Sequence, residues 1–193
     1  QQLRRLCDEH QLLLIVDEVQ TGMGRTGTLF AYQHSGIEPD VMTLGKGIGG
    51  GVPLSALCAK EEVSVFAHGD QGGTYNGNPL VTAAGIAVFD TLTSPGFFDQ
   101  VNQRAQQLAT HLQALSDKWG LEGERGLGLL RALKLDKDDA AAIVDTARTM
   151  RPHGLLLNAA RPNLLRFMPA LNLSEDDLSM AMELLDQAIA QHR

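Results

Sequence analysis

A short apolar run, LLLIV at residues 12–16, ends directly on Asp17. Such a continuous run is typical of a strand buried on both faces of a parallel sheet. A second apolar run occupies residues 41–44, and Lys46 follows it almost at once. In open α/β sheets the ligand crevice lies outside the carboxyl ends of the strands. We therefore expect Asp17 and Lys46 to share one crevice, although they lie far apart in the sequence.

The pattern on either side of these runs predicts an α/β fold followed by a smaller α+β region. Before the break Ser94-Pro95-Gly96 we expect short helices at residues 3–10 and 29–34, a third strand at 54–59 and a helix at 79–92. After the break we expect a helix at 98–119, a strand at 127–135, a helix at 138–150, strands at 155–158 and 164–167, and a final helix capped by Ser174.

These elements divide the chain into two expected domains. Residues 1–96 correspond to the later part of a large domain, and residues 97–193 to a small carboxy-terminal α+β domain. Two or three strands make a poor doubly wound sheet. We therefore expect the front half of the large domain to be absent from this chain.

Composition excludes several classes of function. The 193 residues carry 23 acidic and 16 basic side chains, for a net charge of -7, and no Lys/Arg block that could follow a phosphate backbone. No apolar run approaches the roughly 20 residues of a membrane helix. Cys7 and Cys58 do not form a metal-ligand spacing. We expect a cytoplasmic protein with no nucleic-acid partner, no membrane association and no metal.

The segment GMGRTG at residues 22–27 matches the G-x-G-x-x-G fingerprint of dinucleotide-binding folds. That fingerprint requires its glycines in the first turn after the strand and a helix that starts inside the motif. Here five residues, 17–21, lie between the apolar strand and the first glycine, and no helical pattern begins until Leu29. The spacing argues against a dinucleotide site.

Lys46 lies between Gly45 and Gly47, so little side-chain bulk surrounds it and a flat ligand could approach closely. A lysine amine whose pKa is lowered acts as a nucleophile and forms Schiff bases with carbonyl compounds. A buried aspartate nearby, as we expect Asp17 to be, would suit a protonated pyridine nitrogen. The alternative is that Asp17 caps a turn and Lys46 is a solvated loop residue.

Four segments carry a resemblance to a known family: LIVDEVQTGMGRTG at 14–27, PDV at 39–41, LGKGIGGGVPL at 44–54 and GTYNGNPL at 73–80. In this order they resemble class III aminotransferases, the subgroup that includes acetylornithine, ornithine and 4-aminobutyrate aminotransferases. The resemblance implies a fold-type I pyridoxal 5'-phosphate transferase. It extends over the whole chain but over only the later half of a family member.

The resemblance implies a role for each residue of the cofactor site. Lys46 would bind pyridoxal phosphate as a Schiff base and carry the proton between the substrate Cα and the cofactor. Asp17 would keep the pyridine nitrogen protonated, so that the ring acts as an electron sink. Gln20 would contact the ring hydroxyl, and Glu18 and Val19 would line the same turn.

The resemblance also implies substrate and subunit contacts. Thr74 would reach across a homodimer interface to the partner's cofactor phosphate. Gly73 occupies a substrate-binding position that is often serine in acetylornithine enzymes, so one contact is expected to be lost. Arg166 would bind a substrate carboxylate through its bidentate guanidinium group. The alternative for Arg166 is an ion pair with an acid such as Asp136.

The implied reaction transfers an amino group from an ω-amino or acylated diamino donor to 2-oxoglutarate. Asn158-Ala159-Ala160 before Leu165-Arg166-Phe167 favours the acetylornithine branch and hence N-acetylornithine, as in arginine biosynthesis. Ornithine, succinylornithine and 4-aminobutyrate aminotransferases remain alternatives, and more remotely an aminomutase. A truncated chain without catalysis is the rival of another class, and the isolated fragment is expected to be inactive.

Overall fold

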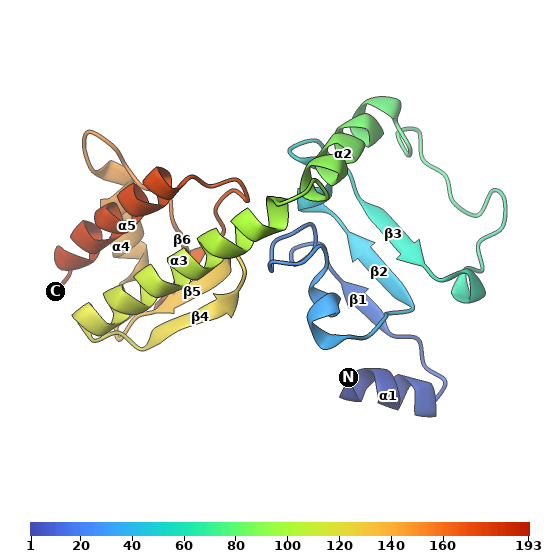
Figure 1. Cartoon of the computed structure of the whole chain (residues 1–193), viewed down its shortest axis with the longest axis horizontal. Coiled ribbons are helices and arrows are strands. Elements are labelled where there is room, and N and C mark those ends of the chain that lie inside the picture. Colours follow the sequence, from blue (N-terminus) through green and yellow to red (C-terminus); the bar gives the residue numbers. More distant parts are fainter. The chain divides into compact units, whose positions relative to one another are not determined.

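The computed structural model describes all 193 residues, which form two compact units, Gln1–Phe98 and Asp99–Arg193 (Figure 1). The two units are described separately below. No single helix in either unit is long and apolar enough to cross a membrane, and the helices Pro79–Leu92 and Phe97–Trp119 meet that test only when taken together, on length and composition alone.

The first unit contains a three-stranded mixed sheet in the order β1-β2-β3, with β1 and β2 parallel and β3 antiparallel to β2 (Figure 1). The predicted strand at 41–44 and helix at 79–92 are confirmed. The elements of this unit are α1 (Gln2–Glu9), β1 (Ile15–Asp17), η1 (Ala31–Ser35), β2 (Val41–Leu44), η2 (Lys46–Gly49), β3 (Ala56–Ala59), η3 (Glu61–Val63) and α2 (Pro79–Leu92).

Asp40 joins several elements at the edge of the sheet where β1 and β2 begin and β3 ends. Its Oδ2 accepts hydrogen bonds from the backbone N–H of Leu14 and from the guanidinium of Arg4, both at 2.7 Å. Its Oδ1 lies 3.4 Å from Nζ of Lys60, which directly follows β3. The N–H of Leu14 and then the Arg4 guanidinium hold the pKa of Asp40 at about 2. One carboxylate thereby ties α1, the start of β1 and the end of β3 together.

The prediction that β1 is buried on both faces is wrong. Met42 and Leu44 of β2 are buried, but Ile15 of β1 and Leu57 of β3 are 61% and 58% exposed. Side chains alternate between the two faces of a strand. The face that carries Ile15 and Leu57 has no cover within the first unit, so apolar composition did not lead to burial there.

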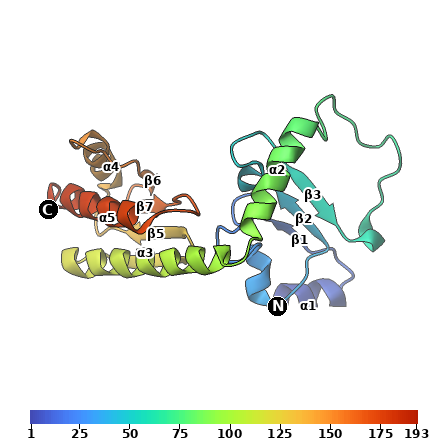
Figure 2. The ribbon, with the colours of Figure 1, turned by 45° about the horizontal axis from the view of Figure 1, so that its top comes forward.

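The second unit is a four-stranded antiparallel sheet in the order β4-β5-β7-β6. Three helices accompany this sheet (Figure 2). Lys118 of α3 pairs with Asp186 of α5 at 2.6 Å, so these two helices lie side by side. The elements are α3 (Phe97–Trp119), β4 (Gly123–Leu127), β5 (Leu130–Lys134), α4 (Ala140–Thr149), β6 (Asn158–Arg161), β7 (Leu164–Phe167) and α5 (Glu175–Ala190).

Two strand predictions in this unit need correction. The strand expected at 127–135 is present as β5, but it is shorter, and it is one arm of a hairpin whose other strand, β4, was not predicted and whose turn uses Gly128 at φ 58°. The strand expected at 155–158 begins only at Asn158, because the N–H of Leu155 donates to the carbonyl of Ala147 in α4. The predicted cap is confirmed: the N–H of Asp177 donates to Oγ of Ser174 at 3.0 Å.

Candidate active site

The carboxyl ends of β1 and β2 bring the two main candidate residues to one edge of the first unit's sheet. Asp17 is the last residue of β1, and Lys46 follows β2 after Gly45 alone. The strands are parallel, with Asp17 in register with Thr43. The carboxylate and the lysine therefore lie at the same edge, which is where ligands bind in open α/β sheets.

The carboxylate of Asp17 is held on one side. Its Oδ1 accepts hydrogen bonds from the N–H of Val19 at 2.9 Å and from Oγ1 of Thr43 at 3.3 Å. Both of these hydrogen bonds end on Oδ1. The side chain is exposed and not buried as expected, so Oδ2 can accept a hydrogen bond from a ligand, as a protonated ring nitrogen would donate.

Lys46 has an unusual backbone conformation. Its φ is +46°, in the left-handed region that residues other than glycine rarely adopt, and it opens η2 with an exposed side chain. Such strain costs of order 1–3 kcal/mol and is concentrated at functional sites. A merely solvated loop lysine explains the exposure but does not require the strain, so the conformation favours a functional role.

The glycines on either side of Lys46 are closely packed. A Cβ on Gly45 would lie 3.1 Å from Cγ1 of Val19, and one on Gly47 would lie 3.2 Å from Cβ of Met23. Larger residues would push the turn after β1 away from the turn after β2. The small residues around Lys46 thus keep the two turns in direct contact.

Glu18 is built into the turn after β1. Its side chain is buried, with 3% exposure. Oε2 accepts a hydrogen bond from Oγ1 of Thr21 at 2.5 Å, and Oε1 accepts one from the N–H of Tyr32 at 2.8 Å. The carboxylate therefore joins the turn to η1. The glycine motif at 22–27 lies in the same loop, and the next helix along the chain begins only at Ala31, whereas in a dinucleotide fold a helix starts inside the motif.

Val19 and Gln20 continue this turn, and both are half-buried. Gly73 and Thr74 lie instead in the exposed segment between η3 and α2. A Cβ on Gly73 would lie 2.8 Å from Oδ1 of Asn76, so the segment turns tightly there. The structure does not link Thr74 by a hydrogen bond to Asp17 or Lys46.

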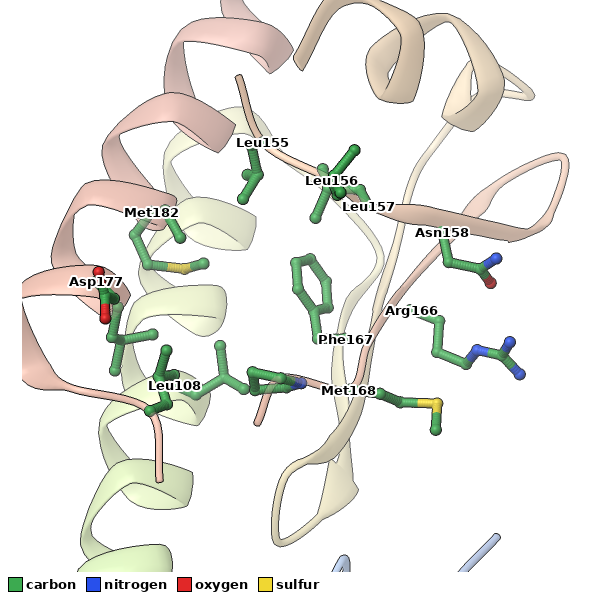
Figure 3. A pocket seen from close by; sticks show the side chains of 14 residues that line it. Leu108, Leu155, Leu156, Leu157, Asn158, Arg166, Phe167, Met168, Asp177 and Met182 are labelled. Atoms are coloured by element: carbon green, nitrogen blue, oxygen red, sulfur yellow. The ribbon is translucent and has the colours of Figure 1, made fainter. Parts of the chain in front are cut away.

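Arg166 lies in β7 of the second unit, in register with Asn158 of β6. It borders a cavity of about 520 Å³ whose other walls are mostly apolar. Figure 3 shows the Arg166 and Asn158 side chains together, on the side of β7 away from the Phe167 ring. Nε of Arg166 is buried without a hydrogen-bond partner. The alternative ion pair with Asp136 is wrong, because Asp136 binds Arg193 at 2.6 Å.

Sequence reasoning did not identify Thr43, which contacts Asp17 from the neighbouring strand. The available signal was its position in the strand that precedes Lys46, but no motif gives the register of two strands. Only the pairing of Asp17 with Thr43 reveals the contact.

Comparison with known families decides where this arrangement belongs. The family described as aminotransferase class-III matches residues 1–189, nearly the whole chain. The chain belongs to this family. Its membership agrees with the expected fold-type I architecture and with an enzyme of the aminotransferase class.

Among class-III relatives, acetylornithine aminotransferase 2 of Bordetella pertussis is 66% identical over 193 residues, which are 100% of this chain and 49% of that protein. Acetylornithine aminotransferase of Ralstonia nicotianae is 60% identical over 192 residues, or 100% of this chain and 48% of that protein. The chain thus spans about half the length of the curated relatives it matches.

Solved structures agree with the class-III fold. N-acetylornithine aminotransferase from Stenotrophomonas maltophilia superposes with a TM-score of 0.85 at 36% identity, covering 98% of this chain and 50% of that one. An S-selective transaminase from Arthrobacter sp. gives a TM-score of 0.90 at 28% identity, covering 99% and 46%. Proteins named for different activities share this fold, so the fold alone does not select a substrate.

Proposed function

We propose that this class-III aminotransferase uses pyridoxal 5'-phosphate to transfer an amino group from N-acetylornithine to 2-oxoglutarate, as in arginine biosynthesis in the cytoplasm. The observation that carries the proposal is the strained Lys46 at the same sheet edge as Asp17. The 66% identity to an acetylornithine aminotransferase supports this choice of donor.

The residues at the sheet edge fit the cofactor. Lys46 would bind it covalently, and the packed glycines on either side leave that lysine accessible. Oδ2 of Asp17 would accept the hydrogen bond of the ring nitrogen. Gln20 would contact the ring hydroxyl, with Val19 lining the turn. When bound, pyridoxal phosphate supplies an electron sink for the bond broken at the substrate Cα.

Each of these residues has a defined task in the proposed reaction. The Lys46 amine would move a proton to and from the substrate Cα. Asp17 would hold the proton on the ring nitrogen, because a carboxylate favours a nearby positive charge. Glu18 would maintain the turn rather than touch the cofactor, since both its oxygens already accept hydrogen bonds. Thr74 would serve the partner subunit's phosphate in a homodimer.

Arg166 is the proposed carboxylate-binding residue. Its unpartnered Nε can donate one of two parallel hydrogen bonds to a carboxylate, which is the geometry that guanidinium groups favour. Both N-acetylornithine and 2-oxoglutarate carry such a group. Gly73 would line the substrate site without a side-chain contact. Ornithine, succinylornithine and 4-aminobutyrate are the competing donors.

Borohydride trapping tests the attachment. The protein is prepared both as this chain and joined to the upstream half that the resemblance leads us to expect, taken from the Bordetella pertussis relative. With pyridoxal phosphate the joined protein should turn yellow, and reduction should fix the cofactor on Lys46, as located by peptide mass spectrometry. The chain alone is expected to be inactive.

Two variants control this experiment. Lys46→Ala should lose the adduct, whereas Arg166→Lys should keep it, because Arg166 binds substrate and not cofactor. Arg166→Lys retains the charge but loses the two parallel N–H donors of the guanidinium group. The value of kcat/KM for 2-oxoglutarate should therefore fall at least about tenfold. An adduct on Lys60 or Lys134 would contradict the assignment, and an amine-donor screen would separate the competing substrates.

A further inference from the structure

Thr43 connects the two strand ends that form the proposed site. It is the register partner of Asp17 in the parallel pair, so both side chains lie on the same face of the sheet. Oγ1 of Thr43 donates to Oδ1 of Asp17 at 3.3 Å, and the carbonyl of Thr43 accepts the N–H of Glu18 at 3.0 Å. Its side chain and backbone thereby hold two successive residues of the turn after β1.

Thr43 is also close in sequence to the proposed cofactor lysine. Leu44 and Gly45 alone separate it from Lys46. On the other side, Thr43 pairs with Leu57 of β3, which has no polar side-chain atom. Across this row of three strands, Thr43 is therefore the residue that can give Asp17 a side-chain hydrogen bond.

We infer that Thr43 is a positioning residue for the cofactor, acting through Asp17; this rests on the proposed function. Together with the N–H of Val19, the Thr43 hydroxyl holds Oδ1, so that Oδ2 would be left to accept the hydrogen bond of the ring nitrogen. Without the hydroxyl, a single donor holds Oδ1 and the carboxylate can rotate. The cofactor then loses part of a preformed contact.

The hydroxyl also affects where the proton lies. A hydrogen bond donated to a carboxylate favours its charged form. Without that donor the carboxylate would be free to turn away from the ring nitrogen, and the ring would be held less firmly in its protonated form. A less positive ring would withdraw fewer electrons from the bond to Lys46, so the absorbance of the bound cofactor should change at a higher pH.

Three variants of the joined protein test this inference. Thr43→Val keeps the shape and removes the hydroxyl, and Thr43→Ser keeps the hydroxyl. Thr110→Val, on α3 of the second unit, removes a hydroxyl that donates to the carbonyl of Gln106. The dissociation constant of pyridoxal phosphate is measured by absorbance titration of each apoprotein, and the pH midpoint of the bound cofactor's absorbance is measured separately.

Thr43→Val should bind pyridoxal phosphate about three- to tenfold more weakly, the range of one net hydrogen bond. Its absorbance midpoint should rise. Thr43→Ser should restore both values, and Thr110→Val should change neither. If Thr43→Val matches the wild type while borohydride still labels Lys46, the inference about Thr43 is overturned alone. If the wild type gives no Lys46 adduct, the proposed function and this inference both fail.

Discussion

The two units differ in how much of their apolar surface they bury. In the first unit the buried apolar side chains are Met23, Met42, Leu44 and Leu92, and all other buried apolar residues of the chain lie in the second unit. Exposed large apolar residues show the opposite distribution: most lie in the first unit, including Ile15, Leu57, Val65 and Phe66. The first unit nevertheless carries the proposed cofactor residues.

This difference separates the stability of the fold from the position of the chemistry. The second unit has a continuous core between its sheet and helices, with Leu108, Leu133, Leu165 and Leu185 at most 1% exposed. The first unit relies more on polar contacts, such as the hydrogen bonds that the carboxylates of Asp40 and Glu18 accept from neighbouring elements. Large exposed apolar areas in a protein mark surfaces that associate with something else. We therefore expect the first unit to depend on such association.

The largest expected effect concerns the separated units. Residues 97–193, which keep α3 whole, should fold alone with a cooperative urea transition and a free energy of unfolding of roughly 5 kcal/mol, given about 0.05 kcal/mol per residue. Residues 1–96 should show no cooperative transition and should bind a dye specific for exposed apolar surface. Circular dichroism and dye fluorescence on the two purified segments check this prediction. A cooperative transition for residues 1–96 would contradict the comparison.

A matched pair of strand leucines sharpens the comparison. Leu133 of β5 is 0% exposed and Leu57 of β3 is 58% exposed. Leu133→Ala should lower the free energy of unfolding of the 193-residue chain by about 2–5 kcal/mol, because it leaves a cavity. Leu57→Ala should change it by less than about 0.5 kcal/mol. A large loss at Leu57 in urea denaturation would show that its face is covered in solution.

Sequence patterns predicted the elements whose signals are local. The strand at 41–44 and the helix at 79–92 have the expected bounds, since the helix begins at a proline preceded by the Asn78 cap. The family segments predicted class-III membership, and the sheet edge shared by Asp17 and Lys46 followed from the α/β pattern. Local chemistry was sufficient for these features.

The remaining features depend on partners distant in sequence. β4 contains Gly123 and Gly126, which have low strand propensity, and it forms because β5 pairs with it. The burial of an apolar strand depends on what covers it, so LLLIV could not indicate that Ile15 is exposed. The contact of Thr43 with Asp17 depends on the register of two strands. The burial of Nε of Arg166 likewise depends on residues that pack around β7 and are distant in sequence, so the sequence alone could not predict it.

The smallest expected effect concerns the carboxylate that ties the first unit together. The folded pKa of Asp40 is about 2, against 3.8 for an ordinary aspartate, because the N–H of Leu14 and the Arg4 guanidinium favour its charged form. A carboxyl group with a depressed folded pKa stabilises the fold fully above its unfolded pKa. That contribution is then lost as the pH falls through the folded pKa. The relevant window is therefore between about pH 4 and pH 2.

The side chain of Asp40 is only 12% exposed, but solvent still screens its pairing, so about 1–2 kcal/mol is expected from this shift. Hydrogen exchange of the Leu14 amide, corrected for its intrinsic rate, measures directly how well the hydrogen bond from Leu14 to Asp40 protects that N–H. Asp40→Asn should lower the protection of Leu14 roughly tenfold at pH 7, and the wild type should approach the variant as the pH falls from 4 to 2. The pair of Lys118 and Asp186 in the second unit, whose side chains are 52% and 31% exposed, is the control, and Asp186→Asn should cost less than about 1 kcal/mol. Equal protection of Leu14 in wild type and Asp40→Asn at pH 7 would mean that the first unit does not depend on this carboxylate. The contrast between a first unit held by polar contacts and a second unit held by an apolar core would then be wrong.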